Sequence, residues 1–295
     1  ELLTLAARVA ASEATVLIQG ETGTGKELLA RLIHQLSLRS ASPLIAVNCA
    51  AIPETLLESE LFGYRRGAFT DARTDKKGLV AEASGGTLFL DEITEMPHVL
   101  QAKLLRVIEE KKVRPLGDTH DVAVDVRFIS ASNRNLKELI HQGGFREDLY
   151  YRLKVIDIEL PPLRERREDI PLLIQHFISK FGTEGKRISG ASEEVVKVLM
   201  NYCWPGNVRE LENVIQRAIT LCREEVLLPE DLPPSLSQDP DENLVGKAFQ
   251  GKYTMDQLEK EYIRKVMVET GGNKSRAAEI LGFDRKTLYR KLEEL

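Results

Sequence analysis

Gly20-Glu21-Thr22-Gly23-Thr24-Gly25-Lys26-Glu27 is a glycine-rich run between a short apolar stretch at 15–18 and a helical pattern at 26–38. This is the strand, loop and helix context of a phosphate-binding loop. The glycines let backbone N–H groups point inward at a β-phosphate, helped by the helix N-terminus, while Lys26 neutralises the phosphate oxygens. A chance glycine-rich turn is the alternative, but the flanking pattern favours a nucleotide site. Glu27 stands where most such loops have Ser or Thr to ligate Mg²⁺, so metal binding must depend on other groups.

A second apolar run, Leu88-Phe89-Leu90, ends in the acids Asp91 and Glu92. Alone, such a run usually marks a solvated strand end. Downstream of a phosphate loop it predicts the other half of an NTPase site. Asp91 would hold Mg²⁺, directly or through water, and Glu92 would polarise the attacking water.

Short β-branched runs alternate with helical stretches in the first half of the chain. The runs are 15–18, 44–47, 87–90 and 126–129, and the clearest helical stretches are 26–38 and 98–111. This alternation predicts an α/β fold, a parallel sheet covered by helices. After Pro161-Pro162 only helical periodicity remains, as at 170–181, so a helical domain should follow.

Composition limits the class of protein. The 295 residues include 41 Lys+Arg, 46 Asp+Glu and 42% hydrophobic residues, which indicates a globular chain of about two domains. Three cysteines without paired metal-ligand spacing suit a reducing cytoplasm. Because no apolar run approaches the roughly 18 residues of a membrane span, we expect a cytoplasmic protein without membrane contact. The chain starts at Glu1 inside a helix-like pattern, from which we expect a further domain upstream.

The C-terminal tail differs in charge from the rest. Residues 251–295 carry ten basic and eight acidic side chains, whereas the whole chain has a net charge of −5. The preceding stretch, 229–243, has four prolines and five acids but no base, and is typical of a linker. Within the tail, two short helical patterns flank Gly282, and Asp284 can cap the second.

These features predict a helix-turn-helix whose second helix enters the major groove of DNA. A charged, solvated helix is the alternative. The candidate DNA contacts share basic or hydroxyl side chains: Lys274, Arg285, Lys286, Thr287, Arg290 and Lys291.

Four segments together resemble the AAA+ ATPase domain of sigma-54-dependent transcriptional activators, the bacterial enhancer-binding proteins. They are 20–27, Gly67-Ala68-Phe69-Thr70-Asp71-Ala72, Gly85 to Glu92, and Trp204-Pro205-Gly206-Asn207-Val208-Arg209-Glu210. In that family Glu is usual at the position of Glu27. The resemblance covers nearly residues 1–235, and the tail is similar to the Fis-type DNA-binding domain that follows this ATPase.

The resemblance implies a P-loop AAA+ parallel sheet with helices on both faces, a helical lid and a small all-α helix-turn-helix domain. We expect the ATPase subdomain at 1–162, the lid at 163–235, a linker at 236–250 and the DNA-binding domain at 251–295. All residues of the loop 20–27 (Gly20, Glu21, Thr22, Gly23, Thr24, Gly25, Lys26 and Glu27) would bind ATP.

The resemblance also implies roles for individual side chains. Asn48 matches a switch asparagine that holds Glu92 away from water, and Asn133 matches the first sensor of the γ-phosphate. Arg146 and Arg152 match arginine fingers offered to a neighbouring subunit's ATP. Arg209 matches the second sensor. A single such arginine would more readily be a solvated or salt-bridged side chain, but their joint placement favours these roles.

The segment Gly67-Ala68-Phe69-Thr70-Asp71-Ala72 reads from composition as a polar loop with one exposed aromatic. By resemblance it is the loop that grips sigma-54, with Phe69 and Thr70 as contacts. The family most often has Gly where this chain has Asp71, and the change adds a charge and removes backbone freedom. Fingers acting in trans require an oligomer, and the resemblance implies a hexameric or heptameric ring.

Taken together, the resemblance implies a bacterial, ATP-hydrolysing activator that uses Mg²⁺, binds palindromic enhancer DNA as a dimer and opens the sigma-54 RNA polymerase promoter complex. Such activators often act in two-component regulatory systems. Two alternatives are an AAA+ remodeller with another target and a DNA-binding regulator whose ATPase has lost its motor role. Gly67 to Thr70 argue against the former, and the catalytic residues (Lys26, Asp91, Glu92, Arg146 and Arg152) against the latter.

Overall fold

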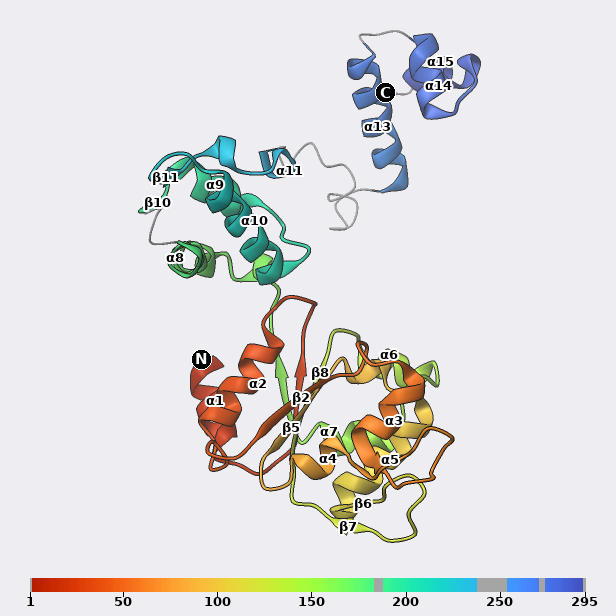
Figure 1. Ribbon diagram of the computed structural model, residues 1–295. Helices are drawn as coiled ribbons and strands as arrows, with labels where there is room; N and C mark the ends of the chain where they lie inside the picture. Colours follow the sequence, from red (N-terminus) through yellow and green to blue (C-terminus); the bar gives the residue numbers. More distant parts are fainter. Residues whose placement is uncertain (1, 183–187, 238–253, 271–273, 294–295) are drawn as a thin grey trace. The chain divides into compact units, whose positions relative to one another are not determined.

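The computed structural model describes residues 2–182, 188–237, 254–270 and 274–293, and Figure 1 shows their helices and strands. The chain packs as two units, which are described separately below. The first contains residues 1–169 and 204–213, and the second contains residues 170–203 and 214–295.

A five-stranded sheet in the order β2-β5-β8-β1-β9 is the centre of the first unit. Its strands are all parallel: β1 (Val16–Gln19), β2 (Leu44–Asn48), β5 (Thr87–Asp91), β8 (Arg127–Ser132) and β9 (Ile156–Glu159). The β-branched runs at 15–18, 44–47, 87–90 and 126–129 thus became strands of one sheet. The predicted fold class, a P-loop AAA+ sheet covered by helices, is confirmed.

Side chains that alternate along the strands enter two separate cores. Leu17 packs in the core beneath α3, α5 and α7, whereas Val16 and Ile18 pack in the core beneath α1 and α2. Figure 1 shows the two groups of helices on opposite sides of the sheet. The helices of this unit are α1 (Leu2–Ala10), α2 (Lys26–Gln35), α3 (Glu54–Phe62), α4 (Leu79–Glu82), α5 (His98–Glu110), α6 (Leu136–His141) and α7 (Glu147–Leu153).

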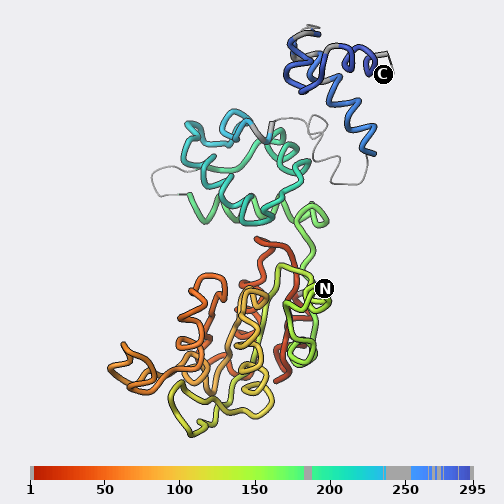
Figure 2. The backbone as a smooth tube through the Cα atoms, turned by 90° about the vertical axis from the view of Figure 1, so that its right-hand side faces the viewer, coloured from red at the N-terminus to blue at the C-terminus, as the bar shows by residue number. Residues whose placement is uncertain are grey.

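Two small hairpins and three 3-10 turns complete the first unit. One hairpin pairs β3 (Gly63–Tyr64) with β4 (Lys76–Lys77) and carries the loop 67–72; its orange segment extends from the domain in Figure 2. The other pairs β6 (Lys112–Val113) with β7 (Val122–Ala123). The turns are η1 (Ile93–Glu95), η2 (Leu163–Glu165) and η3 (Arg167–Asp169).

The second unit is mainly helical, as predicted for the region after Pro162. It contains α8 (Ile170–Phe181), α9 (Glu193–Asn201), the rest of α10 (Asn207–Leu221), η4 (Pro229–Asp231) and α11 (Pro234–Ser237). The prediction that strands stop there was wrong in one detail, because β10 (Gly190–Ala191) pairs with β11 (Val226–Leu227). Two-residue strands are too short to produce a periodic pattern.

Part of the acidic, proline-rich stretch from 229 is folded rather than a linker. Leu232 and Leu236 are buried, and the Asp231 carboxylate accepts a hydrogen bond from the Leu228 N–H at 2.9 Å. Composition missed these two anchors because the polar residues around them dominate it. Most of the predicted linker at 236–250 lies outside the described residues.

The C-terminal helices are α13 (Met255–Glu269), α14 (Lys274–Leu281) and α15 (Arg285–Glu293). They share a small core of Ile263, Val266, Ala277, Ala278 and Leu288. The two alanines let the helices approach closely, and Gly282 makes the turn between α14 and α15 with a φ of 68°.

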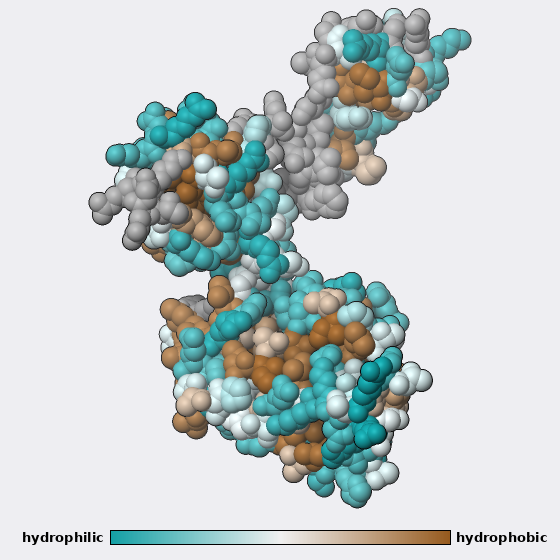
Figure 3. Space-filling view, in the orientation of Figure 1, coloured by the Kyte–Doolittle hydropathy of each residue, from teal (hydrophilic) through white to brown (hydrophobic). Residues whose placement is uncertain are grey.

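Some apolar side chains stay at the surface of the first unit, including Leu28, Tyr151 and Val155. The space-filling view shows hydrophobic patches among hydrophilic surface on this unit (Figure 3). Within the described part of the chain, every helix is too short or too polar to cross a membrane.

Candidate nucleotide site

The strand order gathers the predicted site residues at the carboxyl edge of the sheet. The loop 20–27, which we call the phosphate loop, follows β1, and Asn133 follows the adjacent β8. Asn48 and Asp91 end the paired strands β2 and β5 opposite one another. The carboxyl edge of a parallel sheet is where ligands of α/β folds bind.

The phosphate loop holds the Lys26 ammonium over its own backbone. Gly23 and Gly25 have φ of 80° and 102°, in the left-handed region, and Lys26 begins α2. The Lys26 Nζ donates hydrogen bonds to the carbonyl oxygens of Gly20 at 2.8 Å and Glu21 at 2.9 Å. A bound phosphate can replace these carbonyls, because it is a stronger acceptor for an ammonium.

Carboxylates near Lys26 oppose the effect of its burial. Burial lowers the pKa of the Lys26 ammonium, whereas the charges of Asp91 and Glu92 act to raise it. The lysine and the two acids are therefore close enough to interact electrostatically. This is the charge arrangement expected where a metal and phosphates bind together.

The acids at the end of β5 differ in their surroundings. Glu92 has a left-handed backbone with a φ of 50° and turns the chain from β5 into η1, a conformation that is uncommon for a non-glycine residue. The Asn48 Nδ2 donates to Asp91 Oδ2 at 3.4 Å. The resemblance implies that Asn48 holds Glu92; among the described contacts its amide hydrogen bond goes to Asp91 instead.

The two predicted sensors both reach the phosphate loop. The Asn133 Nδ2 donates to Thr22 Oγ1 at 3.2 Å. At the start of α10, the backbone N–H groups of Val208 and Arg209 donate to the Gly23 carbonyl at 3.0 and 3.3 Å. The Arg209 charge also acts to lower the pKa of Lys26.

Glu27, the unusual residue of the loop, is paired within its own helix. The Arg31 Nε and Nη2 donate to Glu27 Oε1 at 3.0 and 2.7 Å. Arg31 thus offsets the negative charge of Glu27, which stands where most phosphate loops have the hydroxyl of Ser or Thr. The i,i+4 spacing of the two residues could have predicted this pair from the sequence.

The predicted arginine fingers lie at the two ends of α7 and pair with carboxylates of the same chain. Arg146 donates to Asp148 at 3.0 and 2.6 Å, and this hydrogen bonding raises the pKa of Arg146. The Arg152 Nε donates to Glu109 Oε1 at 2.8 Å. The exposed Arg152–Glu109 pair contributes roughly 0–1 kcal/mol, so an anion that binds more strongly could replace Glu109.

The loop predicted to contact sigma-54 is a tight turn. The Gly67 N–H donates to the Ala72 carbonyl at 2.8 Å, and the Ala72 N–H donates to the Phe69 carbonyl at 3.0 Å. Phe69 is 43% exposed, although its ring meets Tyr64 edge-on with centroids 4.9 Å apart. Thr70 and Asp71 are exposed beside it, and Ala68 is half-buried.

An ion-pair cluster at the base of this turn joins it to the second hairpin. Arg65 donates to Asp75 at 2.6 Å and to Asp118 at 2.7 Å. The hydrogen bonds from Arg65 hold the pKa of Asp118 well below its usual range. Both carboxylates are therefore ionised at neutral pH, and the base of the loop is fixed by charge.

The predicted DNA contacts are not equivalent. Lys286 and Arg290 are exposed on α15. Asp284 caps that helix, because its carboxylate accepts from the N–H and the Oγ1 of Thr287, at 2.9 and 2.7 Å. The Lys291 Nζ donates to Glu259 Oε2 at 2.6 Å.

Lys274 is the first residue of α14 and lies against a residue of α15. Its Nζ is 4.5 Å from the centre of the Tyr289 ring. The side chain of Arg285 lies outside the described residues. Of the predicted DNA contacts, Thr287 and Lys291 thus each have a structural partner, Asp284 and Glu259, in addition to any contact with DNA.

Comparison with known families covers nearly the whole chain. Residues 1–159 match the Sigma-54 interaction domain. The chain belongs to the sigma-54 activator family. Further along the chain, residues 164–247 match the AAA+ ATPase lid domain and residues 254–295 match the Fis family of bacterial regulatory proteins.

Curated relatives of this chain include two bacterial regulatory proteins. Regulatory protein AtoC of Escherichia coli K12 is 49% identical over 294 residues, which are 98% of this chain and 64% of AtoC. Transcriptional regulatory protein ZraR of Salmonella typhimurium LT2 is 48% identical over 293 residues, 99% of this chain and 66% of ZraR. The chain thus spans just under two thirds of the length of these relatives.

A solved structure of NtrX from Brucella abortus in complex with ATP is also similar to this chain. The identity is 36% and the TM-score 0.74, over 99% of this chain and 66% of that one.

Three partners of the site residues were not predicted from the sequence. Glu109 binds Arg152, and Arg164 and Asn207 both bind Glu21. Each lies far in sequence from the residue it contacts, so no local pattern could have found it.

Proposed function

We propose that this chain is an ATP-hydrolysing transcriptional activator, which binds enhancer DNA and remodels the closed promoter complex of sigma-54 RNA polymerase. One observation carries the proposal. Lys26, Asn133 and Arg209 contact the phosphate loop, and the charge of Asp91 acts on Lys26, in a chain whose first 159 residues match the Sigma-54 interaction domain.

ATP is the substrate that this site fits. The loop glycines leave backbone N–H groups free of side-chain cover, and the buried Lys26 ammonium faces the loop interior, where it would bind the β- and γ-phosphates. Glu92 would accept a proton from the attacking water. Asn133 and Arg209 would contact the γ-phosphate from two other segments.

Asp91 is the residue that would hold Mg²⁺. It lies beside Lys26 and Asn48 at the end of β5, whereas Glu27 is engaged by Arg31. The bound ion would neutralise the charge that develops on the phosphate oxygens. Asn48 would orient the Asp91 carboxylate through its amide.

Hydrolysis would require a ring. Arg146 is half-buried and Arg152 is exposed, and both are bound to carboxylates that a neighbour's nucleotide could replace. The exposed Tyr151 and Val155 lie beside Arg152 in the sequence and supply apolar surface for a subunit contact. A hexamer or heptamer would place these arginines against the adjacent phosphate loop.

The turn at 67–72 would transmit the motion of this ring to sigma-54. It presents Phe69, Thr70 and Asp71 outward from a hairpin whose base is fixed by Arg65. Lys286 and Arg290 on α15 would contact the major groove. A dimer formed through α13 would read a palindromic site.

In vitro transcription from a sigma-54 promoter tests this proposal. We expect open complexes with ATP but none with a non-hydrolysable analogue, and none with Glu92→Gln in ATP. A matched promoter read by another sigma factor should not respond. Opening without hydrolysis, or hydrolysis without any effect on sigma-54 polymerase, would replace the proposal by one of the two alternatives.

A further inference from the structure

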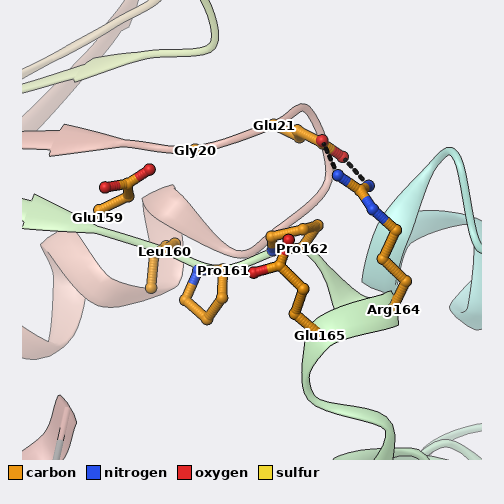
Figure 4. Close-up of a pocket in the computed structure, with 8 residues that line it drawn as sticks. All are labelled: Gly20, Glu21, Glu159, Leu160, Pro161, Pro162, Arg164 and Glu165. Atoms are coloured by element: carbon orange, nitrogen blue, oxygen red, sulfur yellow. Dashed lines mark hydrogen bonds and ion pairs between the residues drawn. The ribbon is translucent and has the colours of Figure 1, made fainter. Parts of the chain in front are cut away.

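Three segments that are distant in sequence meet at one carboxylate, that of Glu21. The Arg164 Nη1 and Nη2 each donate to a different oxygen of Glu21, at 2.8 and 2.7 Å, as Figure 4 shows. The Asn207 Nδ2 donates to Glu21 Oε2 at 3.1 Å. Glu21 belongs to the phosphate loop, Arg164 to η2 and Asn207 to the first turn of α10. We call these three residues the Glu21 network.

Asn207 is the buried centre of this network. It has no exposed surface, and its φ of 54° is in the left-handed region that Asn tolerates better than most residues. Besides Glu21, its Nδ2 donates to the Thr22 carbonyl at 3.0 Å, and its Oδ1 accepts from the Leu163 N–H at 2.8 Å. A buried amide with all these contacts fixes the segments relative to one another.

The same turn of α10 touches the tip of the phosphate loop through glycine. A Cβ added to Gly23 would lie 2.3 Å from the Gly206 carbonyl oxygen and 3.2 Å from the Arg209 Cβ. Together with the hydrogen bonds from the Val208 and Arg209 N–H groups to the Gly23 carbonyl, this contact fixes the position of the Arg209 backbone and Cβ. The position of Arg209 relative to bound phosphates therefore depends on how α10 is attached.

Charge holds the network in one state at neutral pH. The hydrogen bonds from Arg164 lower the pKa of Glu21, and burial only partly opposes them. A hollow of about 480 Å³ is lined by both members of the Glu21–Arg164 pair (Figure 4), whose side chains are 43% and 39% exposed. A pair so exposed contributes little to stability, but its bidentate geometry restricts the direction of both side chains.

We propose that Glu21, Arg164 and Asn207 are positioning residues that hold Arg209 against the phosphate loop, so that the effect of Arg209 on ATP depends on the Glu21–Arg164 pair. This inference rests on the proposed ATPase function. The network acts through Arg209 and through the start of α10. The Glu21 side chain would thus position Arg209, whereas the backbone of the phosphate loop would bind the phosphates.

A double-mutant cycle tests the inference. ATP hydrolysis and calorimetric binding of ATPγS are measured for the full chain, Arg164→Gln, Arg209→Ala and the double variant. We expect Arg209→Ala to weaken binding about tenfold and Arg164→Gln about fivefold. The double variant should be no weaker than Arg209→Ala, because Arg164 has no side chain left to position once that of Arg209 is removed.

Two further measurements separate positioning from general instability. In Arg164→Gln, hydrogen exchange at the Val208 and Arg209 amides should become faster while the unfolding temperature stays close to that of the parent. Arg164→Lys keeps the charge without the bidentate geometry and should be intermediate. Arg106→Gln removes an exposed arginine of α5 that is not part of the network and should match the parent.

The outcomes distinguish the two levels of the argument. Failure of the parent to bind or hydrolyse ATP would refute the proposed function itself. If the parent hydrolyses ATP and Arg209→Ala is impaired, but the two losses multiply or the α10 amides exchange as in the parent, only the positioning role is overturned.

Discussion

The ion pair between Arg152 and Glu109 allows a quantitative test of the proposed ring. Glu109 binds Arg152 through one hydrogen bond of 2.8 Å, and the two side chains are 41% and 58% exposed. Such a pair is worth roughly 0–1 kcal/mol. If Arg152 must leave Glu109 to reach a neighbouring nucleotide, Glu109→Gln removes that cost and should favour the active ring by up to about fivefold.

The assay is ATP hydrolysis measured over a range of protein concentrations at saturating ATP. For Glu109→Gln, half-maximal specific activity should occur at a protein concentration up to about fivefold lower than for the parent. Glu110→Gln removes the same charge one residue further along α5 and is the matched control. Arg152→Ala should be inactive at every concentration.

Two results would refute this reasoning. One is a higher protein requirement for Glu109→Gln, which would mean that Glu109 stabilises the active ring. The other is identical behaviour of Glu109→Gln and Glu110→Gln, which would mean that the pair plays no part in assembly. Mixing Arg152→Ala subunits with Lys26→Ala subunits should partly restore hydrolysis if the finger acts in trans.

Other predictions concern catalysis, coupling and DNA. Glu92→Gln should bind ATP like the parent but lose turnover in a steady-state assay, because an amide cannot accept the proton. Phe69→Ala should abolish open-complex formation while hydrolysis continues, whereas Asp71→Gly should change activation by no more than roughly 1 kcal/mol, as for an exposed charge. Arg290→Ala should weaken DNA binding by about 1–3 kcal/mol if it reads a base. Lys291→Ala should mainly lower the melting temperature of the DNA-binding domain; unchanged melting with weaker binding would contradict that assignment.

Much of the fold followed from local patterns. β-branched runs predicted four of the five strands of the sheet, all except β9. The pattern at 170–181 predicted α8, because apolar residues recur every three to four positions on the buried face of a helix. The loop 20–27 was readable because its chemistry lies in adjacent residues. The turn between α14 and α15 was readable for the same reason, through Gly282 and Asp284.

Contacts that depend on the order of strands were not readable. The Glu21–Arg164 pair joins residues 143 positions apart, and Arg152 meets Glu109 across 43 positions. Thr287 shows a subtler limit. Its hydroxyl suited a DNA contact equally well, and only the structure shows that Asp284 engages it.

Two glycines of the phosphate loop are restricted for different reasons, and this affects how such a motif is interpreted in other chains. Gly25 has open space around a built Cβ, so only its left-handed backbone with a φ of 102° excludes other residues. At Gly23 a side chain would also collide with the Gly206 carbonyl. A descendant of this protein that no longer used ATP would still need glycine at 23 to keep α10 attached, but could lose the glycine at 25 once the loop was free to take another shape. Retention of the first glycine without the second would therefore be the mark of a domain that keeps its architecture after losing its nucleotide.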